Sequence, residues 1–348
     1  MVELLHAETP SDVDRAASLL AHQQVVAFPT ETVYGLGADA RSDDAVSKVF
    51  RAKGRPSDNP LIVHVASRDM VDELVQSDAV TPLVNRLMNA FWPGPLTLIL
   101  PVRPGVLSTL VTAGLNTVGV RVPGHPVALQ LLSLSHVPVA APSANTSGRP
   151  SPTLARHVAA DLGHSEHVSA ILNGGATGVG VESTVIRVTD ETITILRPGG
   201  VTREQLSQYA TVTVDPGLLD QGETPMSPGM KYTHYAPRAP VTVLQGDAAF
   251  VRRCTQEALQ EARGKVALLK MDTLGVSLDD DGTKRLHVLS LGATVDDMAR
   301  LLYARLRECD DLGVEVILAQ DCVNEGVGSA VRNRLLKAAA GCRRQSSK

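Results

Sequence analysis

The sequence is poor in the residues that several classes of protein depend on. Aromatic side chains make up only 3% of the 348 residues, too few for the stacking surfaces on which single-strand nucleic-acid-binding proteins rely. The formal net charge is -4, whereas broad, non-specific binding of nucleic acid needs a basic surface. Any contact with an anion is therefore expected to be local.

Cysteines and long apolar runs are also scarce. The four cysteines, Cys254, Cys309, Cys322 and Cys342, include no pair with the CxxC spacing, so we expect neither a disulfide framework nor a zinc site, and we predict no metal ligands. No apolar run approaches the ~20 residues of a membrane span, and the N-terminus lacks the pattern of a signal peptide. We therefore expect a cytoplasmic protein without a membrane partner.

Length and patterning indicate two domains joined by a connecting segment. Over residues 1–210, strands outnumber those of a simple alternating βα pattern, which predicts an α+β domain around a twisted mixed sheet. Residues 211–240 contain five prolines and three glycines without periodicity; because two tyrosines, a histidine, a lysine and an arginine are concentrated there, we predict a lid rather than a spacer. Residues 241–348 alternate strands and helices, which predicts a smaller α/β, Rossmann-like domain with a largely parallel sheet, in a supporting or regulatory role.

A basic stretch stands out in the first domain. A predicted helix over 42–50 leads into a loop carrying Arg51, Lys53 and Arg55, and a predicted strand over 61–65 follows. Three cations within five residues repel one another, and an anion among them would relieve that repulsion. A triphosphate is the obvious candidate, since arginine binds phosphate in a bidentate manner and lysine as a point charge. The alternative is a solvated surface loop.

Polar turns follow two predicted strands, and a glycine-rich loop precedes another. Residues 29–37 and 142–149 are rich in hydroxyl and amide side chains, which can bind a small ligand at the end of a strand or simply cap a turn. The glycines of residues 173–180 would let backbone N–H groups approach a phosphate closely, although glycine-rich turns are common.

Three polar side chains fall within predicted strands. Arg121 and Arg197 each need a partner if they are buried, either a carboxylate of the protein or one of a ligand. His64 also lies in a predicted strand, where it is either a hydrogen-bonded core histidine or a ligand contact.

Several of these segments occur together as motifs, in order along the chain. They are PTETVYGL at 29–36, KGRP at 53–56 with NPL at 59–61, WPGPLT at 92–97, RVP at 121–123 and PSAN at 142–145. In this combination, residues 5–210 resemble the YrdC-type threonylcarbamoyl-AMP synthases. The segment YTHYAP at 232–237 and the C-terminal domain are similar to the long, two-domain form of that family.

The resemblance implies a reaction and its substrates. Members of this family convert L-threonine, bicarbonate and ATP into L-threonylcarbamoyl-adenylate and pyrophosphate, a nucleotidyl transfer in which Mg²⁺ accompanies the triphosphate. The product is passed to a tRNA threonylcarbamoyl transferase, so direct binding of tRNA is expected to be weak or absent.

The resemblance also implies site residues. Those of the L-threonine site are Thr32, His64, Arg121, Ala141 and Ser183. Those of the ATP site are Arg55, Asn59, Thr117, Ser143, Ser151, Arg197 and, from the lid, Tyr235. Because no acid–base pair is evident, we predict that Lys53 and Arg55 promote the reaction through their charge.

Two other readings compete with this one. A carbamoyl-transfer, nucleotide-binding domain of the hydrogenase-maturation type shares YrdC-like motifs, but such proteins carry acylphosphatase-like and zinc-finger segments that the cysteine pattern does not favour. An RNA-binding module would use the basic stretch at 48–55 to contact phosphates, which the net charge and the scarcity of aromatics disfavour.

Overall fold

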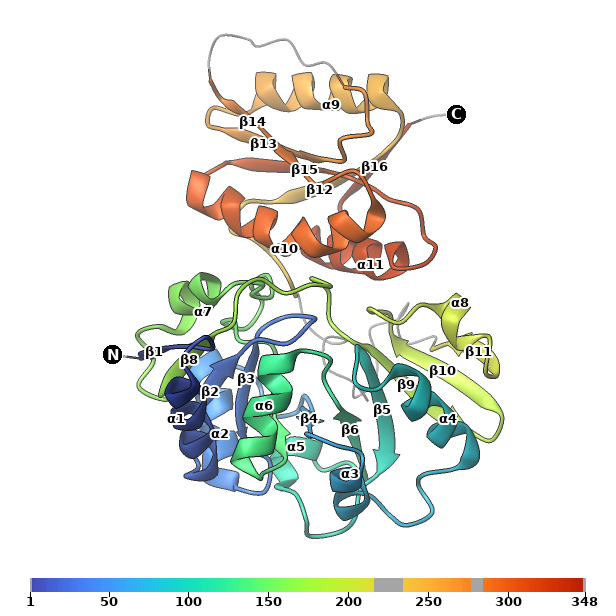
Figure 1. Cartoon of the computed structure of the whole chain (residues 1–348). Helices are drawn as coiled ribbons and strands as arrows, with labels where there is room; N and C mark the ends of the chain where they lie inside the picture. The colour runs from blue at the N-terminus through green and yellow to red at the C-terminus, as the bar shows by residue number, and fades with distance from the viewer. Residues whose placement is uncertain (1, 216–233, 277–283, 347–348) are drawn as a thin grey trace. The chain divides into compact units, whose positions relative to one another are not determined.

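The computed structural model describes residues 2–215, 234–276 and 284–346, which fall into two compact units (Figure 1). The first unit comprises residues 2–147 and 151–215, and the second comprises 148–150, 234–276 and 284–346. Within these ranges, no helix is both long and apolar enough to span a lipid bilayer. The chain thus contributes three residues from the middle of the first unit to the second.

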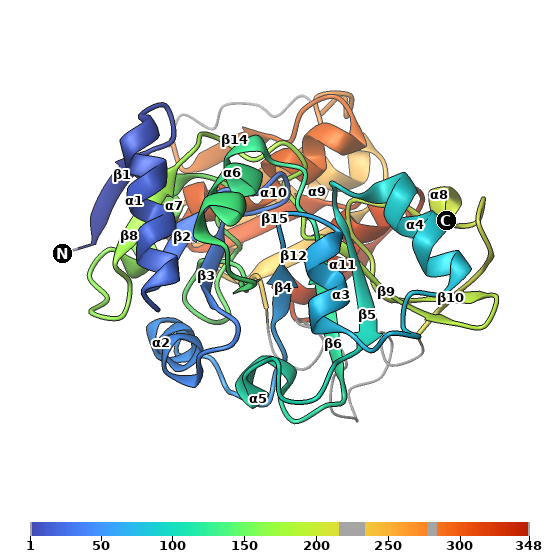
Figure 2. The same cartoon turned by 60° about the horizontal axis from the view of Figure 1, so that its bottom comes forward.

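The first unit is built on one mixed sheet. Within the described residues, its eleven strands lie in the order β1-β8-β2-β3-β7-β4-β6-β5-β9-β10-β11. Figure 2 labels all of them except β7 and β11. Their bounds are β1 Glu3–His6, β2 Val26–Phe28, β3 Gly35–Asp39, β4 Ile62–His64, β5 Leu96–Pro101, β6 Thr117–Arg121, β7 Val139–Ala140, β8 Ala170–Asn173, β9 Thr184–Thr189, β10 Thr192–Arg197 and β11 Thr211–Val214. Pairs such as β4–β6 and β5–β9 are parallel, whereas β2–β3 and β5–β6 are antiparallel, so the predicted mixed sheet is confirmed.

Helices cover both faces of this sheet. Their bounds are α1 Pro10–Ala21, α2 Asp43–Lys53, α3 Asp69–Leu74, α4 Pro82–Phe91, α5 Thr109–Thr112, α6 Pro126–Ser135, α7 Ala155–Leu162 and α8 Arg203–Leu206. Successive side chains of a strand point to opposite faces. Accordingly, Val26 and Phe28 pack in one apolar cluster with residues of α1 and α6, while Val25 and Ala27 pack in another with residues of α2 and α7.

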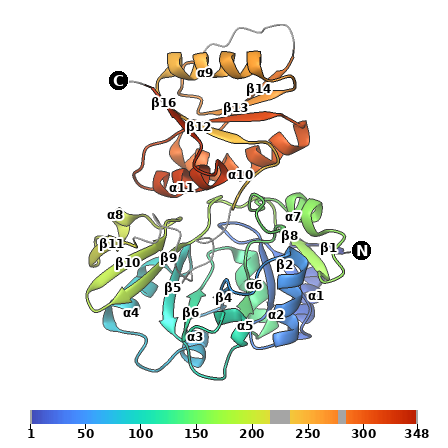
Figure 3. The same cartoon turned by 180° about the vertical axis from the view of Figure 1, so that it is seen from behind.

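The second unit contains a smaller, parallel sheet. Its strands are β12 Val241–Gln245, β13 Val266–Lys270, β14 Leu286–Ser290, β15 Val316–Gln320 and β16 Arg343–Gln345, in the order β14-β13-β15-β12-β16. All of these neighbours pair in parallel. Helix α9 (Ala248–Glu261) lies on one face, and α10 (Val295–Leu312) and α11 (Gly328–Ala338) lie on the other (Figure 3). The predicted α/β fold with a largely parallel sheet is confirmed.

Several predicted boundaries were wrong. Helix α2 continues through Lys53 and ends where Gly54 adopts φ 60°, a left-handed conformation that glycine accepts without strain; Arg51 and Lys53 are therefore helical and not part of a basic loop. Strand β3 begins at Gly35, within the residues 29–37 that were predicted as a polar turn, and β11 lies in the segment predicted as irregular. Strands β1 and β16 and the short helix α5 were not predicted.

Within the second unit, Asp310 holds the three-residue segment 148–150. Its side chain is only 3% exposed, and its Oδ2 accepts a hydrogen bond from Arg149 Nη2 at 2.7 Å. Its Oδ1 accepts the backbone N–H of Arg238 at 2.7 Å. One buried carboxylate on α10 therefore joins two segments that are distant in sequence.

We predict that Asp310→Asn loosens this connection. The amide side chain keeps the shape of the carboxylate but loses its charge, and hydrogen bonds to charged groups contribute about 2 kcal/mol each. The amide of Arg238 should then exchange its hydrogen roughly 30-fold faster, as measured by hydrogen–deuterium exchange. Asp311→Asn, at an exposed neighbouring position, is the control. Unchanged protection of Arg238 in the Asp310 variant would contradict the prediction.

Candidate active site

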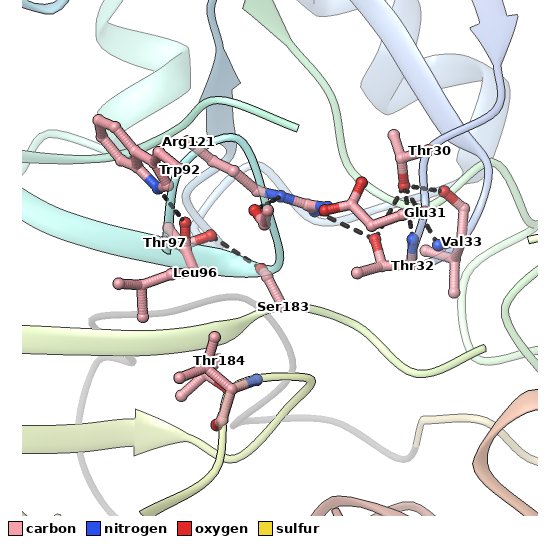
Figure 4. A network of polar contacts seen from close by, with 12 residues as sticks. Thr30, Glu31, Thr32, Val33, Trp92, Leu96, Thr97, Arg121, Ser183 and Thr184 are labelled. Atoms are coloured by element: carbon pink, nitrogen blue, oxygen red, sulfur yellow. Dashed lines mark hydrogen bonds and ion pairs between the residues drawn. The ribbon is translucent and has the colours of Figure 1, made fainter. Parts of the chain in front are cut away.

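Arg121, the last residue of β6, lies at the centre of a buried polar network (Figure 4). Its guanidinium donates from Nε to the carbonyl oxygen of Gly94 at 3.1 Å and from Nη1 to Thr32 Oγ1 at 3.0 Å. Its Nη2 forms an ion pair with Glu31 Oε1 at 2.5 Å. Arg121 is 3% exposed, and a charge so buried requires partners of this kind. The carboxylate of the protein, one of the two partners expected from the sequence, is Glu31.

The turn after β2 is fixed by its own hydroxyl group. Thr30 Oγ1 donates to the carbonyl oxygen of Val33 at 2.6 Å and accepts the backbone N–H groups of Thr32 and Val33, each at 3.2 Å. It also lies 2.8 Å from Thr32 Oγ1. A side chain that bonds the backbone two or three residues on stabilises a turn in this way. The side chains of the turn therefore emerge from a rigid backbone.

The glycine-rich loop supports the same turn. The N–H of Val179 donates to the carbonyl oxygen of Glu31 at 2.7 Å, and the N–H of Gly180 donates to that of Thr32 at 3.1 Å. These two amides are engaged by the protein itself. Their role is to position the turn, whereas the glycine content of the loop predicts amides that bind phosphate.

Ser183, just before β9, contacts side chains of the two neighbouring strands β5 and β10. Its Oγ lies 2.8 Å from Thr97 Oγ1 of β5, as Figure 4 shows. Arg197, at the end of β10, donates from Nη2 to the Ser183 carbonyl oxygen at 2.9 Å and to its Oγ at 3.1 Å. Ser183 is thus one partner of Arg197.

His64 lies beside Arg121 and is buried. The two residues are paired in the parallel ladder of β4 and β6, and the His64 ring meets that of Phe28 edge-on at 6.2 Å. Burial, together with the charge of Arg121, lowers the pKa of His64 to about 3. Near neutral pH, His64 is therefore an uncharged imidazole. Nearby, the N–H of Ala141 donates to the carbonyl oxygen of Ile62 in β4 at 2.9 Å.

Lys53 supports the polar turn that follows β7. Its side chain, at the end of α2, is 2% exposed, and its Nζ donates to the carbonyl oxygens of Ser143 at 2.6 Å and Asn145 at 2.5 Å. A cation is also favoured at the C-terminal end of a helix. Ser143 Oγ in turn donates to Asn145 Oδ1 at 2.6 Å. The ammonium group fixes the backbone that carries Ser143.

Arg55 and Asn59 lie close together in the segment after α2. Arg55 Nη2 donates to the carbonyl oxygens of Asn59 and Pro60, both at 3.3 Å. Asn59 is buried, and within the described ranges its side-chain oxygen has no hydrogen-bond partner. Buried oxygens without a partner are rare and call for an explanation, and a ligand donor is one.

The other predicted ATP residues are more widely spread. Ser151 Oγ donates to Glu182 Oε1 at 2.6 Å, with both residues buried. Thr117 begins β6, four residues before Arg121, which places it roughly 13 Å away along the strand. There it pairs with Pro101, at the far end of β5. The structure therefore does not bring Thr117 next to Arg121.

Tyr235 belongs to the second unit, where its ring stacks on that of Tyr303 with a centroid distance of 5.4 Å. The Arg334 guanidinium lies over the same ring, 5.5 Å from its centroid. Most of the predicted lid, residues 216–233, lies outside the described residues. The roles predicted for the lid and for Tyr235 therefore stay predictions.

Two acidic residues of this region were missed in the sequence analysis. Glu31 contacts Arg121, and Glu182 contacts Ser151. Glu31 could have been found, because a buried arginine on a strand requires an anion and Glu31 lies in a polar turn at a strand end. Nothing in the sequence links Glu182 to Ser151.

Comparisons with known proteins define the family. A family model described as "Telomere recombination" (Sua5_yciO_yrdC) matches residues 18–199, and one described as "Threonylcarbamoyl-AMP synthase, C-terminal domain" matches residues 201–340. The chain belongs to the Sua5/YciO/YrdC family. It is 48% identical to a threonylcarbamoyl-AMP synthase of Bacillus subtilis, over 94% of this chain and 93% of that protein.

The chain is also similar, over nearly its full length, to a protein from Pyrococcus abyssi. This threonylcarbamoyl-AMP synthase is 45% identical over 93% of this chain and 92% of that protein. A crystal structure of Pyrococcus abyssi Sua5 complexed with L-threonine is similar with a TM-score of 0.90 and 41% identity, and the match covers 100% of both chains. The recognition of a long, two-domain member from its motifs is confirmed.

We predict that His64 makes the stability of the fold depend on pH. Its pKa of about 3 in the folded chain lies below the ordinary value of about 6.5, so the unfolded chain takes up the proton first. The contribution of His64 to the free energy of unfolding should be fully present above pH 6.5. Below that pH it should fall by roughly 1.4 kcal/mol per pH unit. Urea denaturation at pH 7.5 and pH 5 measures this loss.

His64→Phe should remove that part of the pH dependence, because phenylalanine fills similar space and does not titrate. His164→Gln, at an exposed position, should keep it. The same loss of stability in wild type and His64→Phe between pH 7.5 and pH 5 would show that another group is responsible.

Proposed function

We infer that this chain synthesises L-threonylcarbamoyl-adenylate from L-threonine, bicarbonate and ATP, and releases pyrophosphate. The observation that carries this inference is the buried guanidinium of Arg121, which lies among Thr32, His64 and Glu31. The match over both chains to a protein whose structure holds L-threonine supports it. In chemical class the enzyme is a nucleotidyltransferase that uses an amino-acid carbamate as its acceptor.

For L-threonine, we assign the carboxylate to Arg121, because a guanidinium is a permanent positive charge that favours carboxylates. Uncharged His64 offers one N–H donor and one acceptor nitrogen, which suits a neutral hydroxyl group better than an ion. Thr32, which accepts a hydrogen bond from Arg121, and Ser183 add hydroxyl groups, and Ala141 adds a small apolar side chain. These roles rest on the positions of the side chains and on the family.

For ATP, we assign the phosphates and sugar to polar groups outside the Arg121 network. These are Arg55, Asn59, Thr117, Ser143, Ser151 and Arg197, together with Tyr235 of the predicted lid, as the resemblance to the family implies. Lys53 acts by holding the backbone of Ser143 in place and by adding a positive charge next to the Ser143 carbonyl group. We propose that Mg²⁺ enters already bound to the triphosphate, because this ion is usually held through substrate phosphates.

The chemical step joins two anions. The carbamate of threonine attacks the α-phosphorus of ATP, and pyrophosphate leaves. Fixed positive charge that is already oriented lowers such a barrier without further rearrangement. We therefore propose that Arg55 acts by charge and that no side chain serves as an obligatory base.

The remaining parts of the proposal concern partners and location. The product goes to a tRNA threonylcarbamoyl transferase, and the net charge of -4 supports weak or absent direct contact with tRNA. We place the reaction in the cytoplasm, where tRNA is modified. Similarity to synthases over both halves of the chain favours this function over a hydrogenase-maturation domain or an RNA-binding module.

Product analysis tests the proposed function. The protein is incubated with ATP, bicarbonate and Mg²⁺ together with either L-threonine or L-serine, and the adenylate is identified by mass spectrometry. We expect threonylcarbamoyl-adenylate and pyrophosphate with threonine, and much less product with serine, which lacks the methyl group. Absence of any adenylate with threonine would refute the function.

We predict that Arg55→Ala lowers the rate of pyrophosphate release by roughly 100-fold, the usual effect of removing one preorganised electrostatic contact. Arg55→Lys keeps the charge but loses the planar fork, so its rate should fall between those of wild type and Arg55→Ala. Arg51→Ala, at an exposed position of α2, is the control and should leave the rate unchanged. Near-normal rates in both Arg55 variants would rule out the role assigned to its charge.

A further inference from the structure

The Glu31–Arg121 ion pair leaves part of the Glu31 carboxylate unused. Oε1 lies 2.5 Å from Arg121 Nη2. Oε2 is buried, and among the described residues it has no hydrogen-bond partner. A carboxylate oxygen that is withdrawn from water without a donor is costly. An incoming ligand that brings a donor would remove this cost.

Arg121 by itself does not account for the binding of an amino acid. Its three nitrogens already face Gly94, Thr32 and Glu31, and its charge is balanced by Glu31. A second carboxylate at Arg121 would place two negative groups on one buried cation, and like charges at such a distance repel strongly. A positive group must therefore accompany the ligand carboxylate.

An α-amino acid carries such a group. Its ammonium and carboxylate are attached to the same carbon atom, so both ions arrive together. Arg121 and Glu31 form a pair of opposite charges in direct contact, as Figure 4 shows. A zwitterion laid against this pair places its negative end toward Arg121 and its positive end toward Glu31.

We propose that Glu31 binds the α-ammonium group of L-threonine and thereby makes the site selective for α-amino acids over hydroxy acids. This inference rests on the proposed function, because it assumes that threonine binds at Arg121. Glu31 is suited to the task because the carbonyl oxygens of Glu31 and Thr32 are held by the N–H groups of Val179 and Gly180. The carboxylate thus projects from a fixed backbone.

Calorimetric titration of Glu31→Gln with L-threonine tests the proposal. The glutamine keeps the size of the side chain and loses its charge, so affinity for L-threonine should fall about 10- to 100-fold, the range for a hydrogen bond between charged groups. Affinity for ATP should not change, which also reports that the variant is folded. Glu8→Gln, at an exposed position in the same unit, is the matched control and should bind threonine as wild type does.

A second ligand separates binding of the ammonium from a general effect on Arg121. The deaminated analogue 2,3-dihydroxybutanoate keeps the carboxylate and the β-hydroxyl group and has a hydroxyl in place of the amine. Wild type should bind it at least 10-fold more weakly than threonine, and Glu31→Gln should bind the two ligands with similar affinity. If Glu31 had only a structural role, Glu31→Gln would still bind threonine more tightly than the deaminated analogue.

The contrary outcomes are distinct. Equal or tighter binding of threonine by Glu31→Gln would mean that Glu31 only neutralises Arg121 and competes with the ligand, and it would overturn the proposal. If Glu31→Gln does not fold, wild type decides: similar affinities for threonine and the deaminated analogue would also overturn it. Failure of wild type to bind threonine at all would instead refute the proposed function.

Discussion

A buried guanidinium must be surrounded by acceptors and balanced by a negative charge, and at Arg121 this requirement organises the neighbouring chain. The carbonyl of Gly94, the hydroxyl of Thr32 and the carboxylate of Glu31 all converge on it. These partners come from two connections, one before β5 and one after β2. The resulting arrangement explains why the turn after β2 is so firmly held by its own hydroxyl and by the glycine-rich loop: a displaced turn would leave the cation without its counter-ion.

Much of the fold follows from the order and spacing of apolar residues. Alternating strands and helices predicted the parallel sheet of the second unit, and an excess of strands predicted the mixed sheet of the first. Short elements were harder to predict. Strand β3 has the sequence GLGAD, whose glycines disfavour a strand, yet it pairs with β2 and β7. Its conformation depends on these two neighbours, of which β7 is distant in sequence.

The candidate site was predictable in its residue types but not in its contacts. The motif RVP contains Arg121, and the resemblance to the family implied His64 and Ser183, whereas Glu31 was not among the predicted site residues. Lys53 illustrates the opposite error: as one of three clustered cations it was expected on a loop, but helix α2 turns it inward onto two backbone carbonyls. Which way a side chain faces depends on where its helix ends, and sequence patterns locate helix ends poorly.

The burial of Lys53 has a chemical consequence. The adenylate that this family makes is a mixed anhydride, which primary amines cleave readily, so an accessible lysine beside it would be acylated and would waste the product. An amine can attack only through a free lone pair. The nitrogen of Lys53 is held as a donor to Ser143 and Asn145 and is shielded from solvent. If the nucleotide lies over Ser143, the chain supplies positive charge there while protecting itself from modification by its own activated intermediate.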